Sequence, residues 1–394
     1  MQYLKHLIIL LAIATTTFFV SNVLINGSLN HKLNLGGELK SSADSLYQWK
    51  ISQEAPFKYR VLHRAVVAGV YQIISGSGGE DDNELFFTAY RIMAFIFHYL
   101  AICLFYYFLN QTKLKIYALA GAIIFALLPA MSLAYNVPVH TREDTLAYSL
   151  LLLGLVSIFK NKSVWILAFS ILGILCRETL LLLPFVNLFF NPQQKIFFRL
   201  LIAGLCFATF FGIRMYIGYS PYNHWEGFDW NRTHLIQVIG FAFITFGVFW
   251  FPFLLQLKNR SSLSLELSII TRSGLPVFLI VFFTTFIGGI FNEIRIIYLI
   301  APWVISLSLD FYSRQSDEIG KTLRSKNFKI YAITLICITT VASYISLTQY
   351  VEVIKRSRYD IPYSTWIFVA TIQVFFFALS LPYFRNKFRG LTNQ

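Results

Sequence analysis

The residues best suited to chemistry lie in the first long polar segment, residues 27–60, which follows one apolar run. This segment contains Asp44 and Tyr47, and it ends in a basic stretch at Arg60. A carboxylate can act as a general base, an aromatic ring can stack on a ligand, and an arginine can hold an anion with two parallel hydrogen bonds. A plain connection between helices needs only a few residues. We therefore interpret the segment as the edge of an active site.

Further charged groups lie at the ends of apolar runs, and most of them place an arginine next to a carboxylate. Charges at the edge of a membrane span are costly, and they usually face a protein interior or a water-filled cavity. Each group could also be a local ion pair that only neutralises itself. Because the groups recur beside the polar segment, we expect them to converge with it on one anionic ligand. The candidates are His63 and Arg64; His140, Arg142, Glu143 and Asp144; Arg177 and Glu178; and Glu293 and Arg295.

The cysteines and histidines give no sign of a metal site. The four cysteines are scattered along the chain, and no two have a CxxC spacing. No spacing of His with Asp supports a metal ion either, and both His63 and His140 fit a hydrogen-bonded or interfacial role. We expect no cofactor.

The composition is that of a membrane protein. Of the 394 residues, 56% are hydrophobic and only 13% are charged, whereas a soluble domain averages about 25% charged residues. The formal net charge of +14 would suggest nucleic acid in a soluble protein. Here basic residues that flank membrane spans explain most of the surplus. We expect a lipid bilayer as a partner and no nucleic acid.

Apolar runs recur along the chain and predict an all-α polytopic protein with roughly 10–13 transmembrane helices. We expect one transmembrane domain over residues 1–394, with an interfacial helix at 61–75 after the first loop. No internal repeat is evident. The runs lie at 7–25, 86–109, 116–134, 145–159, 199–218, 234–256, 274–291, 296–312, 330–348 and 364–384.

The basic residues also predict the orientation in the membrane. More than half of the Lys and Arg residues fall in short segments that lie on one side if the N-terminus is cytoplasmic. This distribution follows the positive-inside rule. It places both termini in the cytoplasm and the loop at 27–60 on the extracytoplasmic side. An arginine-rich group remains outside, against the rule, and an anionic ligand would explain it.

The segment between Lys162 and Lys195 is too short for two ordinary crossings, although both ends are basic. About 32 residues give about 48 Å of helix, and two crossings need about 30 Å each. We expect two shortened helices that meet near Arg177 and Glu178.

These features together resemble the GT-C superfamily of integral-membrane glycosyltransferases. Asp44, Tyr47 and the following Pro-Phe-Lys-Tyr-Arg-Val-Leu stretch at 56–62 are similar to the first-loop pattern of many bacterial members. The groups at 142–146 and 177–179 resemble positions where such proteins place charge. Glu293 and Arg295 match part of a segment of eukaryotic mannosyltransferases, whose His and Lys are missing here. The adjacent acidic pair that some members carry in the first loop is also absent.

The resemblance implies a bacterial inner-membrane enzyme that moves a sugar from a polyprenyl-phosphate donor to a glycan or lipid-linked acceptor. It implies shortened helices around an outward-facing cavity and an inverting reaction. Asp44 would be the general base, with Glu143 or Asp144 as the next candidates, and the arginines would hold the phosphate. An O-antigen-type polysaccharide polymerase or ligase is the main alternative, and a transporter is a third.

Overall fold

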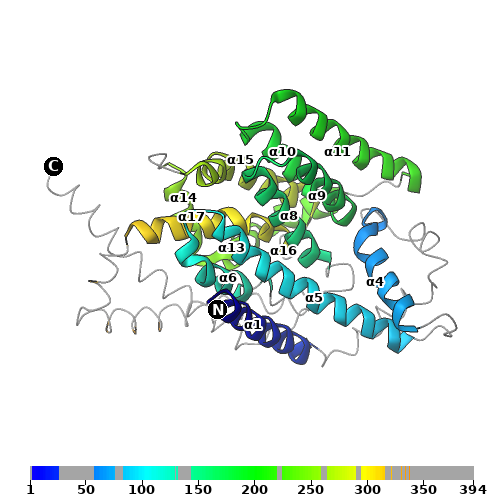
Figure 1. The fold of residues 1–394 in the computed structure, drawn as a ribbon, viewed down its shortest axis with the longest axis horizontal. Helices are drawn as coiled ribbons and strands as arrows, with labels where there is room; N and C mark the ends of the chain where they lie inside the picture. The colour runs from blue at the N-terminus through cyan, green and yellow to red at the C-terminus, as the bar shows by residue number, and fades with distance from the viewer. Residues whose placement is uncertain are drawn as a thin grey trace. The chain divides into compact units, whose positions relative to one another are not determined.

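The computed structural model describes most of the chain up to residue 315 (Figure 1). All regular secondary structure in the described residues is helical, so the all-α class is confirmed. The described residues are 2–25, 57–75, 83–128, 130–131, 143–219, 224–258, 264–289 and 294–315, with Lys321, Ile330, Ile333 and Cys337.

Within the described ranges, neighbouring helices are separated by short breaks, several of which contain a turn of 3₁₀ helix. Most of the expected apolar runs up to residue 312 correspond to a helix; the two later runs lie largely outside the described residues. The α-helices are α1 (Gln2–Ile25), α4 (Val61–Ser75), α5 (Asn83–Asn110), α6 (Ala118–Leu127), α8 (Glu143–Phe159), α9 (Ser163–Cys176), α10 (Leu182–Phe190), α11 (Ile196–Ile217), α12 (His224–Thr233), α13 (Leu235–Phe246), α14 (Trp250–Gln256), α15 (Leu265–Gly288), α16 (Ile294–Ile297) and α17 (Ala301–Arg314). The 3₁₀ helices are η2 (Phe57–Tyr59), η4 (Lys115–Tyr117), η6 (Glu178–Leu181), η7 (Gly247–Phe249) and η8 (Tyr298–Ile300).

Four of the described helical stretches are long and apolar enough to cross a membrane, as judged by length and composition. They are Thr88–Asn110, Ile196–Ile217, Leu265–Gly288 and Ile294–Arg314. Their burial differs widely. Only 17% of the most apolar stretch of Ile196–Ile217 is buried, against 94% for that of Ile294–Arg314. The first of these two is therefore a candidate for contact with lipid, and the second is a core helix.

The chain divides into two compact units. The first contains residues 1–111, 118–126 and 131–226, and the second contains residues 112–117, 127–130 and 227–394. In the first unit, α5 packs against α1, α4 and α8, and α9 packs against α8, α11 and α4. The candidate site described below lies entirely within this unit.

The break between α9 and α10 follows the prediction of two shortened helices. Helix α9 ends at Cys176, and Arg177 adopts an extended conformation, with φ −158° and ψ 128°. A turn of 3₁₀ helix then leads into α10. The lack of a side chain at Gly173 allows this turn to fold back on α9, because a Cβ there would lie 2.8 Å from Leu180 Cδ1 and 3.0 Å from Leu180 Cβ.

The second unit is built on the buried helix α17, which packs against α14 and α15. The Trp303 indole nitrogen donates a hydrogen bond to Ser273 Oγ at 2.8 Å, and Ser308 Oγ donates to the main-chain oxygen of Phe249 at 3.0 Å. The expected run at 234–256 is interrupted here, because Gly247 has φ +52° between α13 and α14. A residue with a side chain rarely adopts that conformation, which explains the glycine at the break.

Candidate functional site

Arg60 connects three segments that lie far apart in the sequence. It lies between η2 and α4, at the end of the polar segment that the sequence singles out. Its Nε and Nη2 donate to the two carboxylate oxygens of Glu178, at 3.0 and 2.5 Å, and its Nη1 donates to Glu143 Oε1 at 2.6 Å. All three guanidinium nitrogens thus bind a carboxylate.

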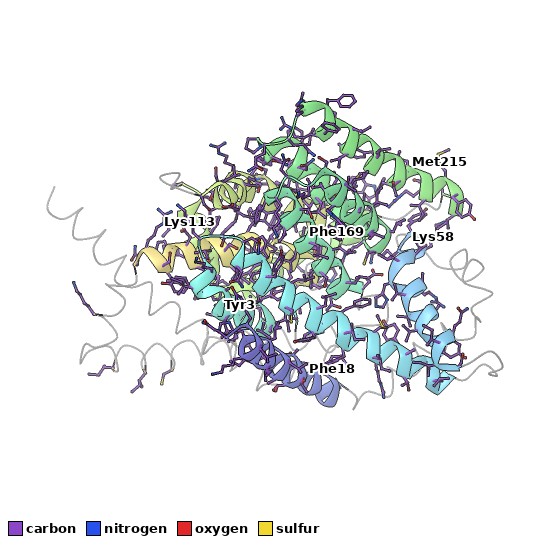
Figure 2. All side chains as sticks on the ribbon, in the orientation of Figure 1. Tyr3, Phe18, Lys58, Lys113, Phe169 and Met215 are labelled. Atoms are coloured by element: carbon purple, nitrogen blue, oxygen red, sulfur yellow. The ribbon has the colours of Figure 1, made fainter. Side chains whose placement is uncertain are left out.

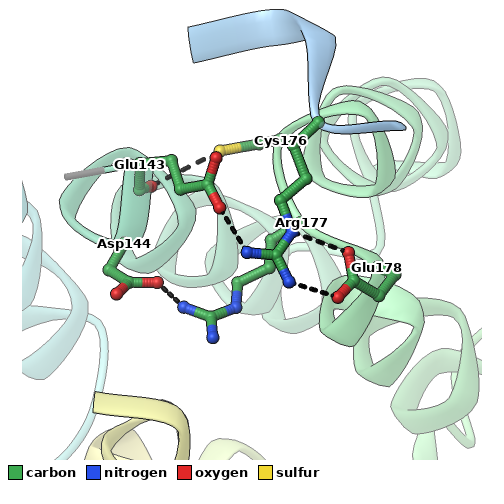
Figure 3. Close-up of polar contacts among 6 residues, drawn as sticks. Glu143, Asp144, Cys176, Arg177 and Glu178 are labelled. Carbon is green, nitrogen blue, oxygen red and sulfur yellow. Dashed lines mark hydrogen bonds and ion pairs between the residues drawn. The ribbon is translucent and has the colours of Figure 1, made fainter. Parts of the chain in front are cut away.

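A second ion pair, between Arg177 and Asp144, lies beside the first (Figure 3). The Asp144 side chain is fully buried, and that of Arg177 is 1% exposed. The Cys176 thiol donates to the main-chain oxygen of Glu143 at 3.5 Å, which joins the end of α9 to the start of α8. We call Arg60, Glu143, Asp144, Arg177 and Glu178 the charged cluster.

The backbone explains how these side chains meet. Glu143 and Asp144 form the first turn of α8, where carboxylates interact favourably with the helix dipole. Arg177 and Glu178 occupy the break after α9, and the Arg177 amide donates to the Gly173 carbonyl at 2.6 Å. Helices α8 and α9 pack side by side. The start of one helix and the end of the other therefore present opposite charges to each other.

Electrostatics favour the charged form of Glu178. Burial alone would raise its pKa, but the charge and hydrogen bonds of Arg60, with the charge of Arg177, lower the pKa to about 2. For Glu143, burial dominates, and its pKa lies above the ordinary value although Arg60 and Arg177 act against the rise. Burial also lowers the pKa of Arg60, but Glu178 and Glu143 raise it above its ordinary value. All three groups lie outside the four candidate spans.

Within the charged cluster, the arginines are neutralised by carboxylates. Two arginines face three carboxylates, so the cluster as a whole does not attract an anion strongly. Glu178 is its most exposed member, with 24% of its side chain accessible, against 7% for Glu143. The arrangement suits a rigid anchor for the chain around Arg60 better than a binding site for a phosphate.

A second basic group lies next to this cluster, on η2 and the last turn of α11. Lys58 Nζ donates to the main-chain oxygen of Gly218 at 2.7 Å, and Tyr59 Oη donates to the same oxygen at 3.3 Å. The guanidinium of Arg214 lies 4.5 Å from the centroid of the Tyr59 ring. Arg214 is not among the residues predicted from the sequence. An arginine in the last turn of an apolar span would have been the signal for it.

The structure places some of the predicted residues in other settings. His63 is buried on α4, with its ring 5.6 Å from Tyr90 and 5.7 Å from Phe97 on α5, so it packs as part of the core. Arg64 is half-buried on α4. Arg295 is buried at the start of α16, in the second unit. Five further candidates lie outside the described residues: Asp44, Tyr47, His140, Arg142 and Glu293.

No group of three His, Cys, Asp or Glu side chains in the described part of the chain is arranged to hold a metal ion. Comparisons with known protein families, with curated proteins and with solved structures find no match to this chain.

Proposed function

We propose that this protein is a membrane glycosyltransferase that uses a polyprenyl-phosphate sugar as its donor. The observation that carries the proposal is the attachment of Arg60 to both Glu143 and Glu178. These contacts bind the last residue of the polar segment at 27–60 to the first residues of α8 and η6. A loop that carries a general base must be held in place relative to its substrates, because misplacement by about 1 Å can cost about 100-fold in rate.

The reaction requires few groups. The acceptor hydroxyl oxygen attacks the anomeric carbon of the sugar as its proton passes to a carboxylate. The bond from that carbon to the phosphate oxygen breaks, and the polyprenyl phosphate leaves with the electron pair. The attack comes from the face opposite the leaving group and inverts the configuration. Cationic side chains stabilise the charge that develops on the phosphate.

The described residues favour Asp44 as the base over the two acidic residues of α8. The Glu143 carboxylate already accepts a hydrogen bond from Arg60 in an ion pair. Asp144 is fully buried against Arg177. A base has to reach the acceptor hydroxyl, so we assign Glu143 and Asp144 a positioning role and leave the chemistry to Asp44. The reaction would take place on the extracytoplasmic side of a bacterial inner membrane.

Mass spectrometry of lipid extracts tests this function without knowledge of the acceptor. Cells that lack the protein should accumulate a monosaccharide linked to polyprenyl phosphate. The parent chain should remove the accumulated lipid, and the Asp44→Asn variant should not. Accumulation of longer lipid-linked oligosaccharides would instead indicate a polymerase or ligase. An unchanged lipid profile would contradict the proposal.

A further inference from the structure

Lys58 and Arg214 are two cations that both lie close to the ring of Tyr59. Lys58 Nζ lies 5.1 Å from the centroid of the Tyr59 ring, and Arg214 Cζ lies 4.5 Å from it. Helix α11 packs against η2, and Figure 2 shows Lys58 beside the end of α11 that carries Met215. Lys58 is 5% exposed and Arg214 is half-buried. Both cations are therefore held in place rather than extended freely into solvent.

In the described part of the chain, this pair differs from the charged cluster in that no carboxylate is bonded to either cation. Among the described residues, neither Lys58 nor Arg214 forms a salt bridge with a carboxylate. Their described hydrogen bonds go to main-chain oxygens, those of Gly218 and Phe210. Glu178 interacts electrostatically with Arg214, but both of its oxygens accept hydrogen bonds from Arg60. A ligand with negative charge would supply the anionic partner for these two cations.

An apolar surface leads to the pair along α11. Phe207 and Phe211 are 50% and 57% exposed. They precede Arg214 by seven and three residues, spacings that place all three on one face of a helix. The surface is continuous with a candidate membrane span. An amphiphile with an anionic head and a hydrocarbon tail matches both parts, the head at the cations and the tail along the helix.

We infer that Lys58 and Arg214 bind the phosphate of the polyprenyl-phosphate lipid, with the prenyl chain along Phe207 and Phe211. The inference rests on the proposed function and revises one part of its expected site. It moves phosphate binding from Arg60 and Arg177, whose charges are neutralised within the cluster, to two cations outside it. Arg60 and Arg177 then position the polar segment and the break after α9.

A general preference of basic residues for lipid head groups is the simplest competing explanation, since long basic side chains often reach toward the membrane surface. The chain provides matched controls for it. Arg199 lies at the opposite end of α11, and it also donates to a main-chain oxygen, that of Leu188 at 2.9 Å. Lys160 lies 5.1 Å from the ring of Tyr107, the same distance that separates Lys58 from Tyr59.

The test measures binding of farnesyl phosphate to the full-length protein in nanodiscs of zwitterionic lipid. Lys58→Gln and Arg214→Gln should each weaken binding by about tenfold or more, as expected for loss of a charge-assisted hydrogen bond. Arg199→Gln and Lys160→Gln should leave it unchanged. Farnesol, phosphatidylglycerol and inorganic phosphate serve as comparison ligands, and each should bind more weakly than farnesyl phosphate. Lys58→Arg, which keeps the charge, should retain more binding than Lys58→Gln.

The result separates this inference from the proposed function. Equal losses in the Arg199 and Arg214 variants, or equal binding of phosphatidylglycerol, would overturn the site in favour of general head-group contact. Unchanged binding in folded Lys58→Gln and Arg214→Gln proteins would also overturn it, even if the parent protein transfers sugar. Selective loss in those two variants supports the site, even if sugar transfer is not found.

Discussion

Arg60 and Glu178 form a two-point ion pair across a separation of 118 residues in the sequence. The contact joins the end of the first polar segment to the break between α9 and α10. Because Arg60 also bonds to Glu143 at the start of α8, movement of any one of these segments would disturb the other two. The cluster thus couples the residues between η2 and α4 to the start of α8 and to the break after α9.

Replacement of Arg60 by lysine should loosen this attachment. Lysine keeps the charge but cannot bond to both oxygens of Glu178 and to Glu143 in the same plane. We expect amide hydrogen exchange in η2 and the first turn of α4 to rise at least about tenfold. Arg64→Lys, a half-buried neighbour on α4, provides the control. Equal exchange in the two variants would show that the Arg60 contacts do not hold this segment.

The buried pair of Arg177 and Asp144 should be sensitive to loss of one partner alone. Asp144→Asn leaves the buried Arg177 charge without its carboxylate, and such changes cost about 3–5 kcal/mol. The double variant Asp144→Leu with Arg177→Met should recover most of that loss, since buried ion pairs are often replaceable by apolar residues. Unfolding followed by tryptophan fluorescence in detergent measures both. A double variant no more stable than the single one would contradict this view of the pair.

The pKa of Glu178 predicts a pH dependence of stability. Its value in the folded protein, about 2, lies below the ordinary 4.5. The ionised form therefore contributes fully to stability above about pH 4.5, and the contribution is lost as the pH falls toward about 2. The raised pKa of Glu143 acts in the opposite direction, and burial, its main cause, is present in both proteins to be compared. We expect the unfolding temperature to fall less steeply between about pH 5 and 3 in Glu178→Gln than in the parent.

Asp229→Asn is the control for this pH experiment, because the pair of Asp229 and Arg232 is more than 60% exposed on both sides. Exposed pairs of this kind contribute little to stability. Its pH profile should follow that of the parent. If the Glu178 variant also follows the parent, the ion pair with Arg60 does not lower the pKa of Glu178 in the folded protein.

A side chain at Gly173 should displace the turn that carries Glu178. Gly173→Ala places a Cβ against Leu180, and overpacking typically costs about 1–3 kcal/mol. Gly204→Ala on α11 is the matched control, since an added Cβ there meets nothing within 4 Å. The control should be neutral or stabilised by up to about 1 kcal/mol through helix propensity. Equal stability of both variants would mean that the turn tolerates a shift.

Some of this architecture could be predicted from the sequence because it depends on local patterns. Apolar runs gave the helices, and the short distance between Lys162 and Lys195 predicted the break near Arg177, which is confirmed. The partner of Arg60 could not be predicted, because a pairing across 118 residues leaves no local pattern. The break at Gly247 was missed because the apolar run continues through it.

In the candidate site, too, the local sequence pattern predicted the residues but not their distant partners. The sequence led us to predict Arg60 and Arg177 as ligands for an anion, since clustered arginines favour anions. Only their contacts in the folded chain show that carboxylates already neutralise them. The sequence shows Arg214 in the last turn of an apolar span, but the role inferred for it depends on the packing of η2 against α11, which no spacing along the chain reveals.

The most direct test of the account is the rate at which purified protein releases polyprenyl phosphate from a polyprenyl-phosphate sugar. The reaction is run in nanodiscs with envelope extract as the acceptor, and the lipid product is measured by chromatography. General-base catalysis contributes about 10²–10⁴-fold, so Asp44→Asn should release product at least about 100-fold more slowly than the parent while remaining folded. Parent protein that releases no polyprenyl phosphate from any sugar donor, or an Asp44→Asn variant with the parent rate, would contradict the account.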